Sequence, residues 1–230
     1  MRTIGLLGGM SWESTAVYYR IANELVRERL GGLHSAKVLL HSVDFAEVAQ
    51  LQRQDRWDDA ADLLGGAAKG LEAAGAEILL ICTNTMHKIA PQVQAATSVP
   101  LLHIGDTTAD AVHAAGLTTV GLLGTRFTME QPFLREHLAA RGLEALVPPA
   151  TDRSTVHDVI FDELCVGVVR EESRQAYRAV IASLVEAGAQ GIVLGCTEIE
   201  LLVGADDTPV PVFPTTRLHV TAAVERALAP

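Results

Sequence analysis

The sequence predicts an α/β protein with mostly parallel sheets, and three observations support this prediction. Short apolar runs typical of buried strands alternate with longer amphipathic or alanine-rich segments typical of helices. Several of the apolar runs end in Gly or Cys followed by polar residues, as strands do where they turn into a helix. The third observation is an internal repeat, in which segments of the first half recur in the same order in the second.

The repeat consists of three pairs of segments with similar sequences. These pairs are residues 4–11 with 120–127, residues 77–85 with 191–198, and residues 99–102 with 210–213. The spacing is nearly constant, since 114 residues separate Cys82 from Cys196 and 116 separate Gly5 from Gly121. This agreement predicts a duplicated half. Two similar halves facing each other would bring two similar strand ends to one cleft.

In the first half, glycine and capping residues mark where the expected elements begin and end. Ile4 to Leu7 is a short apolar run, and Gly8-Gly9 turns it into a helix that Ser11 caps. Such a turn can also bind an anion, although its spacing is neither that of a dinucleotide-binding motif nor that of a P-loop. The other elements expected here are the rest of that helix to Gly31-Gly32, a strand at residues 37–43, a polar helical stretch after Asp44, an alanine-rich helix at residues 58–74 and a strand before Cys82.

The second half restarts the same order of elements at Gly121. Its expected elements are a strand at residues 120–123, a helix near residues 131–141, a polar crossing at residues 151–163, a long helix that ends before Gly188 and a strand at residues 191–194. Strands and helices alternate through the whole chain, and no low-complexity linker separates the halves. This alternation favours parallel pairing of the strands.

Composition excludes several classes of function. A net charge of −10 argues against nucleic-acid and anionic-membrane partners. None of the apolar runs approaches the length of a membrane span, and the N-terminus enters a strand without the pattern of a signal peptide. Three cysteines in 230 residues fit a reducing compartment, so we expect a cytoplasmic protein. The histidines, among them His41, His87, His103 and His219, show no metal-ligand spacing, and no metal is expected.

Cys196 has two interpretations on its own sequence context. It follows the apolar run at residues 191–194 and precedes a helix that Thr197 is expected to cap, with Glu198 in the first turn. Beside a helix N-terminus, the pKa of a thiol is expected below its free value of about 8.5, which suits an acid/base or nucleophilic role. The alternative is a buried, inert Cys that packs as a small hydrophobe.

Three motifs resemble the aspartate/glutamate racemase family. They are Gly-Gly-Met-Ser-Trp-Glu-Ser-Thr at residues 8–15, Cys-Thr-Asn-Thr-Met-His at residues 82–87 and Gly-Cys-Thr-Glu-Ile at residues 195–199. The resemblance spans essentially the whole chain and implies two pseudo-symmetric Rossmann-like lobes with the active site in the cleft between them. It also implies a first lobe of residues 1–98 plus about 212–230, and a second lobe of residues 99–211. Members racemise amino acids without pyridoxal phosphate, and many are dimers, so we expect no cofactor and a homodimer.

The catalytic pair depends on which of two alignments is correct. Racemisation needs one group on each face of the α-carbon, one to remove a proton and one to supply it. The repeat pairs Cys82 with Cys196, whereas the family motif places Thr83 where its members have the first catalytic Cys. Adjacent strand residues point to opposite faces, so only one of Cys82 and Thr83 faces the cleft. We favour Thr83 because Asn84 follows it as in the motif, with Cys196 as the opposing base.

The resemblance also implies the residues that bind the substrate. They are Met10, Gln52, Asn84 and Thr85, with Thr125 and Thr197 as further hydroxyl donors. None of the matched motifs contains a cation for a side-chain carboxylate, so the expected partner is a small amino acid of broad or altered specificity. Which amino acid is the natural substrate stays open at this point.

Two other functions fit the same residues. A single-cysteine decarboxylase or isomerase of a small diacid would use Cys196 alone and leave Thr83 as an oxyanion donor. A non-catalytic small-molecule binding protein would use the same cleft without proton exchange. Incubating single enantiomers in D₂O separates the three, because a racemase incorporates deuterium at the α-carbon, a decarboxylase releases CO₂ from a malonate, and a binding protein does neither.

Overall fold

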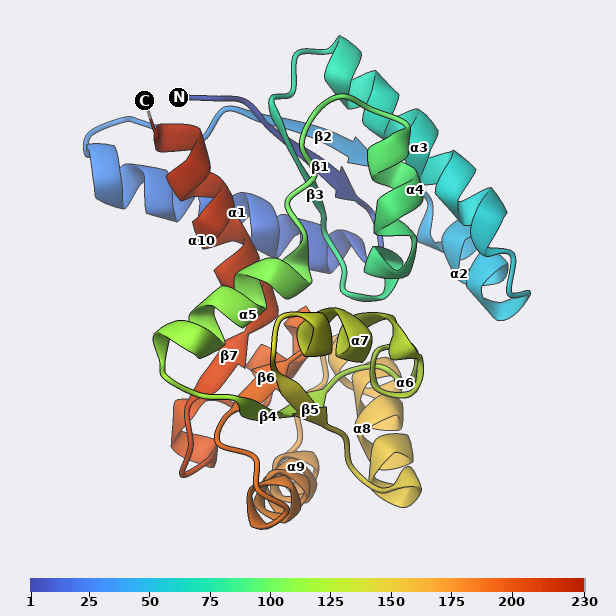
Figure 1. Cartoon of the computed structure of the whole chain (residues 1–230), viewed down its shortest axis with the longest axis vertical. Coiled ribbons are helices and arrows are strands. Elements are labelled where there is room, and N and C mark those ends of the chain that lie inside the picture. Colours follow the sequence, from blue (N-terminus) through green and yellow to red (C-terminus); the bar gives the residue numbers. More distant parts are fainter. Residues whose placement is uncertain (230) are drawn as a thin grey trace. The chain divides into compact units, whose positions relative to one another are not determined.

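The computed structural model describes residues 1–229 and divides into two compact units. Unit 1 consists of Met1–Ile104 and the C-terminal residues from His219, and unit 2 is Gly105–Leu218. Each unit contains one parallel sheet, as the labelled ribbon shows (Figure 1). The predicted α/β class with parallel sheets is confirmed. Within residues 1–229, none of the helices is both long and apolar enough to cross a membrane.

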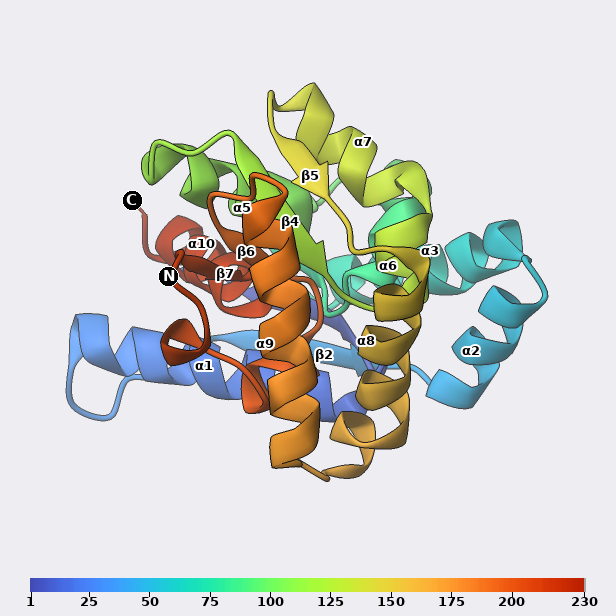
Figure 2. The ribbon, with the colours of Figure 1, turned by 90° about the horizontal axis from the view of Figure 1, so that it is seen from below.

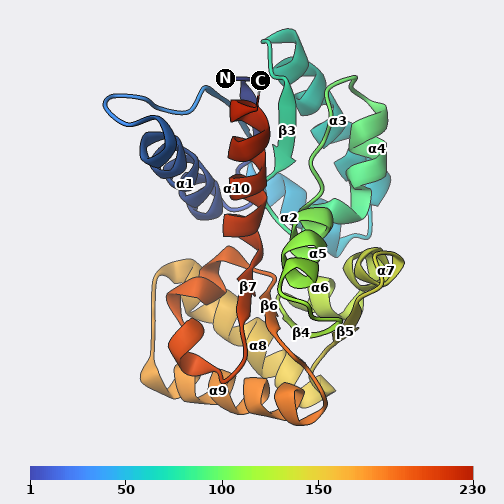
Figure 3. The same ribbon diagram turned by 60° about the vertical axis from the view of Figure 1, so that its left-hand side comes forward.

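The sheet of unit 1 has three parallel strands with helices on both faces. The strands are β1 (Ile4–Gly8), β2 (Val38–Ser42) and β3 (Ile78–Ile81), in the order β2-β1-β3. The helices are α1 (Trp12–Leu30), α2 (Phe45–Arg53), α3 (Trp57–Ala73), the 3₁₀ helix η1 (Thr85–Ile89) and α4 (Ala90–Ala95). Helix α10 (Thr215–Leu228) joins α1 on one face, where both contribute to a buried cluster with Ile78 and Leu80 (Figure 3).

The turn after β1 forms as its sequence predicts. Gly9 has a φ of +91°, and a Cβ at this position would overlap the carbonyl oxygen of Val43, so the turn requires glycine. Ser11 caps α1 by accepting a hydrogen bond from the Ser14 amide at 3.2 Å. The Thr15 hydroxyl accepts the Gly9 amide at 2.9 Å and ties the turn to the helix.

Unit 2 has a four-stranded parallel sheet of the same kind. Its strands are β4 (Thr119–Leu123), β5 (Glu144–Leu146), β6 (Ile192–Leu194) and β7 (Val212–Pro214), in the order β5-β4-β6-β7. Its helices are α5 (Ile104–Ala114), α6 (Arg126–Glu130), α7 (Pro132–Ala140), α8 (Ala150–Asp162), η2 (Leu164–Val166), α9 (Glu171–Glu186), η3 (Thr197–Leu201) and η4 (Ala205–Asp207). Helices α8 and α9 lie side by side and share one buried cluster with β6 (Figure 2).

Residues 151–163 differ from the expected polar crossing, because they form most of helix α8. Val156, Val159 and Ile160 recur at helical spacing among polar residues and pack into the core of unit 2. Three apolar residues on one face of the helix are therefore enough to pack this segment against the core, although most of its residues are polar.

The strand register shows which residues of the two units are equivalent. In unit 1, Leu7 of β1 pairs with Ile81 of β3, and in unit 2 Leu123 of β4 pairs with Leu194 of β6. The pairing on the far side of β3 and β6 agrees, because Leu79 bridges Leu101 while Ile192 pairs with Val212. When β1 and β4 are aligned on the Gly-Leu-Leu sequence that both contain, Ile81 corresponds to Leu194.

This register makes Thr83 the structural counterpart of Cys196, since each lies two residues beyond the equivalent strand position. The pairing of Cys82 with Cys196, which the sequence repeat suggests, is wrong by one residue. A one-residue shift moves a side chain to the opposite face of a sheet, so the correction decides which residues share a face. Thr83 and Cys196 occupy matching places in their own units.

Candidate active site

Thr83 and Cys82 have different surroundings at the end of β3. The Cys82 side chain is fully buried in the cluster that contains Ile78 and Leu80, on the α1 side of the sheet. Burial raises the pKa of the Cys82 thiol, because the apolar core disfavours a charged sulfur. Thr83 is half-buried and begins the turn into η1. Of these two neighbours, Thr83 is the one with an accessible side chain.

Hydrogen bonds hold the turn after Thr83 at its backbone. The Nδ1 atom of His87 lies 2.8 Å from the Thr83 carbonyl oxygen, and the amide of Ile104 donates to Nε2 of the same ring at 3.1 Å. Asn84 and Thr85 are buried beside this contact. The predicted residues Thr83, Asn84 and Thr85 therefore form one ordered turn.

Gln52 and Met10 approach this turn from other elements of unit 1. Gln52 extends from helix α2 and places its side-chain amide nitrogen 3.0 Å from the Met86 sulfur in η1. Met10 is buried and belongs to the same apolar cluster as Met86. All five site residues predicted for the first half therefore belong to one side of unit 1, around the ends of β1 and β3.

In unit 2, Cys196 lies at the end of β6 with a carboxylate as its partner. The half-buried thiol donates to Oε2 of Glu198 at 2.9 Å. Burial is the largest cause that raises the pKa of this thiol, and the negative charge of Glu198 raises it further. The expected lowering of the thiol pKa is therefore wrong. The helix that follows is a 3₁₀ segment of five residues, in which few peptide dipoles align.

Thr197 and Thr125 occupy different roles at their strand ends. The Thr197 hydroxyl lies 2.6 Å from the Thr216 hydroxyl instead of capping η3, whose N-cap residue is Cys196. The expectation that Thr197 caps this helix is therefore wrong, because the first turn of α10 offers its side chain a partner. Thr125 follows the adjacent strand β4 and caps α6, with its hydroxyl accepting the Thr128 amide at 3.4 Å.

Two charged residues near the motifs, Arg56 and Glu163, have partners within their own units. Arg56 forms an ion pair with Asp59 at 2.7 Å, and both side chains are about half exposed. Glu163 accepts hydrogen bonds from Ser173 at 2.6 Å and from Arg170 at 3.3 Å. Arg56 and Glu163 therefore form ion pairs or hydrogen bonds that belong to the structure of their own units.

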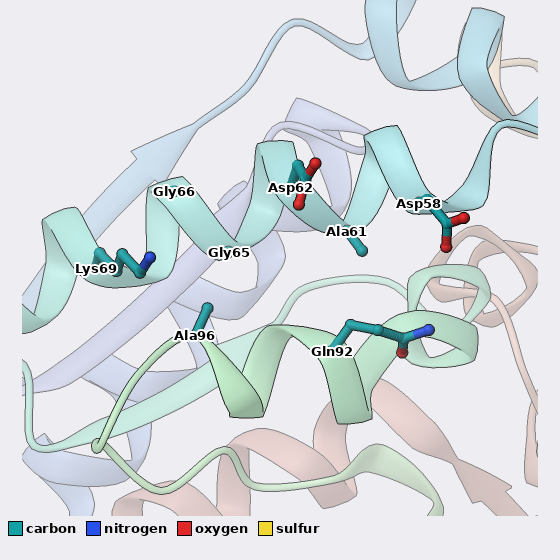
Figure 4. A pocket seen from close by; sticks show the side chains of 8 residues that line it. All are labelled: Asp58, Ala61, Asp62, Gly65, Gly66, Lys69, Gln92 and Ala96. Atoms are coloured by element: carbon teal, nitrogen blue, oxygen red, sulfur yellow. The ribbon is translucent and has the colours of Figure 1, made fainter.

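A surface groove between α3 and α4 lies apart from these strand ends. It has a volume of about 340 Å³, and Figure 4 shows Asp58 and Asp62 along one helix with Gln92 facing them from the other. Its lining includes Gly65 and Gly66 but none of the predicted site residues. The groove therefore has no part in the candidate site.

Two residues join the candidate site that sequence patterns assign elsewhere. The sequence places Glu198 in a first helix turn and shows no metal-ligand spacing around His87, whereas in the structure Glu198 contacts the thiol and His87 contacts the turn at Thr83. Spacing offers a signal for both, because Glu198 follows Cys196 by two residues and His87 follows Thr83 by four, and a side chain at either distance can reach back along a turn. Distinguishing that use from ordinary capping requires the coordinates.

Comparisons with known proteins point to one family. The profile of the Asp/Glu/Hydantoin racemase family matches residues 7–223. A crystal structure from Yersinia pestis, of a protein assigned to the Asp/Glu racemases, is 53% identical with a TM-score of 0.95, and each chain is fully covered. The aspartate racemase homologue of Pyrococcus horikoshii OT3 is 32% identical with a TM-score of 0.89, again over the whole of both chains.

Among curated proteins, the broad specificity amino-acid racemase RacX of Bacillus subtilis (strain 168) is 22% identical over 98% of each chain. The family match covers far more than half of the chain, and it includes both strand ends that carry Thr83 and Cys196. The chain therefore belongs to the Asp/Glu/Hydantoin racemase family, and its activity is that of a racemase, an isomerase.

Proposed function

We propose that this chain is a cofactor-independent amino-acid racemase in which Thr83 and Cys196 act on opposite faces of the substrate α-carbon. The observation that carries the proposal is the strand register, which gives Thr83 and Cys196 matching places after β3 and β6, the strands that pair with β1 and β4. Racemisation removes a proton from one face of the α-carbon and supplies one to the other face, so it needs two proton-transfer groups. Equivalent positions in two similar units can supply these two groups. Thr83 is half-buried and Cys196 is half-buried, so each side chain keeps access to a ligand.

The proton transfers balance as follows in one direction. The thiolate of Cys196 takes the α-proton, so the Cα–H bond breaks and an S–H bond forms. The Thr83 hydroxyl gives its proton to the other face of the carbanion and becomes an alkoxide. Water then returns a proton to Thr83 and is left as hydroxide. The thiol proton passes to this hydroxide through the Glu198 carboxylate, which already accepts a hydrogen bond from the thiol, so Cys196 is a thiolate again. By the family resemblance, Cys196 removes the proton from the L-enantiomer.

The proposed substrates are amino acids of the aspartate/glutamate type or a broader set. The relatives support both, because one is named as an aspartate racemase homologue and another as a broad specificity amino-acid racemase. Backbone amides at the turns after β1, β3, β4 and β6 are the proposed donors for the α-carboxylate, which gains charge in the carbanion. Met10, Gln52, Asn84, Thr85, Thr125 and Thr197 are the proposed binding residues. On the same resemblance we propose a cytoplasmic homodimer.

Incubation of single enantiomers in D₂O tests the proposed function. We expect deuterium at the α-carbon of the product enantiomer and loss of optical rotation, without any added cofactor. ¹H NMR and chiral chromatography follow the two signals for aspartate, glutamate and a panel of neutral and basic amino acids. If none of the panel gains deuterium or changes configuration, the racemase proposal is wrong for these substrates. Release of CO₂ from a malonate would instead favour a decarboxylase.

Replacing Glu198 with Gln is expected to lower the pKa of the Cys196 thiol. The Glu198 charge raises this pKa, so removing the charge makes the thiolate form at lower pH, while burial still raises the pKa. The midpoint of the alkylation rate of Cys196 by iodoacetamide should therefore move to lower pH. The measurement is the rate constant as a function of pH, with mass spectrometry of the labelled peptide.

Two variants control this experiment. Cys196→Ser gives the background from Cys82 and Cys165, and Glu200→Gln removes an exposed charge from the same short helix. We expect Glu200→Gln to leave the midpoint in place. A midpoint for Glu198→Gln that is unchanged or higher than in the wild type contradicts the assignment of Glu198.

A further inference from the structure

We propose that His87 is a positioning residue for racemisation, because it holds the Thr83–Asn84 peptide in the orientation that Thr83 needs to donate its proton. This inference rests on the proposed function, in which Thr83 is the proton donor. His87 lies in η1, four residues after Thr83, and its side chain is 2% exposed. It acts through the backbone of Thr83 and has no contact of its own with the reacting atoms in this scheme.

The two hydrogen bonds of the ring determine its tautomer. The amide of Ile104 can only donate, so Nε2 of His87, 3.1 Å away, must carry a lone pair. The proton of the neutral ring is therefore on Nδ1, which donates to the Thr83 carbonyl oxygen at 2.8 Å. Both nitrogens are used, and a second proton would break the bond to Ile104. His87 therefore stabilises the turn through its two backbone hydrogen bonds and does not relay protons.

The hydrogen bond to the Thr83 carbonyl also orients the Asn84 amide and the Thr83 side chain. A trans peptide is planar, so the carbonyl of Thr83 and the amide N–H of Asn84 point in opposite directions. Holding the carbonyl on the His87 side directs the Asn84 amide to the other side of the turn. The same bond restricts rotation about the Thr83 Cα–C bond. With a β-branched side chain that has few rotamers, this determines where the Thr83 hydroxyl lies.

Neighbouring aromatic rings and a buried backbone segment hold the His87 ring in place. The rings of His103 and His219 pack edge-on against it, with centroids 4.7 Å and 5.5 Å away. His219 is fixed in turn, because its Nε2 lies 2.8 Å from the Leu102 carbonyl and its Nδ1 lies 3.0 Å from the Tyr18 hydroxyl. Ile104 is fully buried at the start of α5. The imidazole therefore joins the catalytic turn to a rigid part of unit 1.

Two amide substitutions separate the two hydrogen bonds. In His87→Asn the shorter side chain places an amide nitrogen near the position of Nδ1, which keeps the donor to Thr83 and loses the acceptor for Ile104. In His87→Gln the longer side chain reaches the position of Nε2, which keeps the acceptor for Ile104 and loses the donor to Thr83. Both remain polar, and each leaves one buried bond, so their stabilities should be similar.

The readout is the balance between exchange and inversion in D₂O, which a purely structural role would not change. Starting from the enantiomer on which Cys196 acts, Cys196 can return a deuteron to the same face after its thiol exchanges with solvent. Inversion also requires Thr83. We expect His87→Gln to lower inversion by about 10- to 100-fold while exchange with retention stays within about threefold of the wild type. His87→Asn should keep inversion within about threefold of the wild type.

Several results would overturn the role of His87. One is a folded His87→Gln variant with the wild-type ratio of inversion to exchange, and another is an equal loss of both reactions. If His87→Gln fails to fold, His87→Asn decides, and loss of inversion in a folded His87→Asn variant contradicts the proposal. Circular dichroism and thermal unfolding establish folding. Failure of the proposed function looks different, since the wild type itself would then neither invert nor exchange any amino acid.

Discussion

Replacing Cys196 with Ser is expected to lower kcat/KM for racemisation by about 10²- to 10⁴-fold, the range that general acid–base catalysis contributes. The reason is that a serine hydroxyl is a far weaker acid than a thiol, so the base that removes the α-proton is lost. The loss should be equal in both directions, because two enantiomers have the same free energy in water and their equilibrium constant is one. Chiral chromatography of initial rates from each enantiomer measures it.

Cys165→Ser is the matched control for this substitution. Cys165 is also a half-buried cysteine of unit 2, and it packs against the same apolar cluster as Cys196. Its replacement should leave kcat/KM within about threefold of the wild type. If Cys196→Ser retains wild-type rates while Cys165→Ser loses them, the wrong sulfur has been assigned.

Replacing Thr83 with Cys is expected to raise kcat/KM by about tenfold or more in both directions. A thiol with a pKa near 8.5 donates and accepts protons far more readily near neutral pH than an aliphatic hydroxyl does. Thr83→Val keeps the shape of the side chain and removes the hydroxyl, so it should lower inversion instead. The diagnostic result is that Thr83→Cys raises the rate of inversion and Thr83→Val lowers it, measured as initial rates from each pure enantiomer.

Cys82→Ala tests the competing alignment. Cys82 is fully buried, so its truncation should lower the midpoint of thermal unfolding while kcat/KM of the folded enzyme stays within about threefold of the wild type. Loss of racemisation in Cys82→Ala, together with unchanged rates in Thr83→Cys and Thr83→Val, would restore Cys82 as the catalytic residue. An increase for Thr83→Cys in only one direction would violate the equilibrium between enantiomers and point to an assay error.

Local signals explain what the sequence predicts correctly. Apolar runs, the Gly8-Gly9 turn and the Ser11 cap depend on neighbours a few residues away, and each forms as expected. The fold class follows from the alternation of such signals. Helix α8 is harder to predict because its three buried apolar residues stand among polar ones, and only the core of unit 2 shows that they share a stripe.

The candidate site is less predictable because it depends on register and burial. Cys-Thr occurs in both halves, and matching these letters pairs Cys82 with Cys196, whereas the hydrogen-bonded strands pair Thr83 with Cys196. The similarity between the two halves does not reveal this shift of one residue, whereas the resemblance to the family motif favours Thr83. The pKa of Cys196 also depends on its surroundings, since burial and Glu198 outweigh the short helix that follows it.

The enclosed position of Cys82 has a consequence for chemical damage. Sulfur is the atom in such turns that peroxide and electrophiles attack, and attack requires both exposure and a thiolate. With Cys82 buried in the core and an alcohol, Thr83, in the half-buried position, the turn after β3 exposes no thiol. The turn that carries Thr83, the proposed proton donor, is thus protected from thiol oxidation.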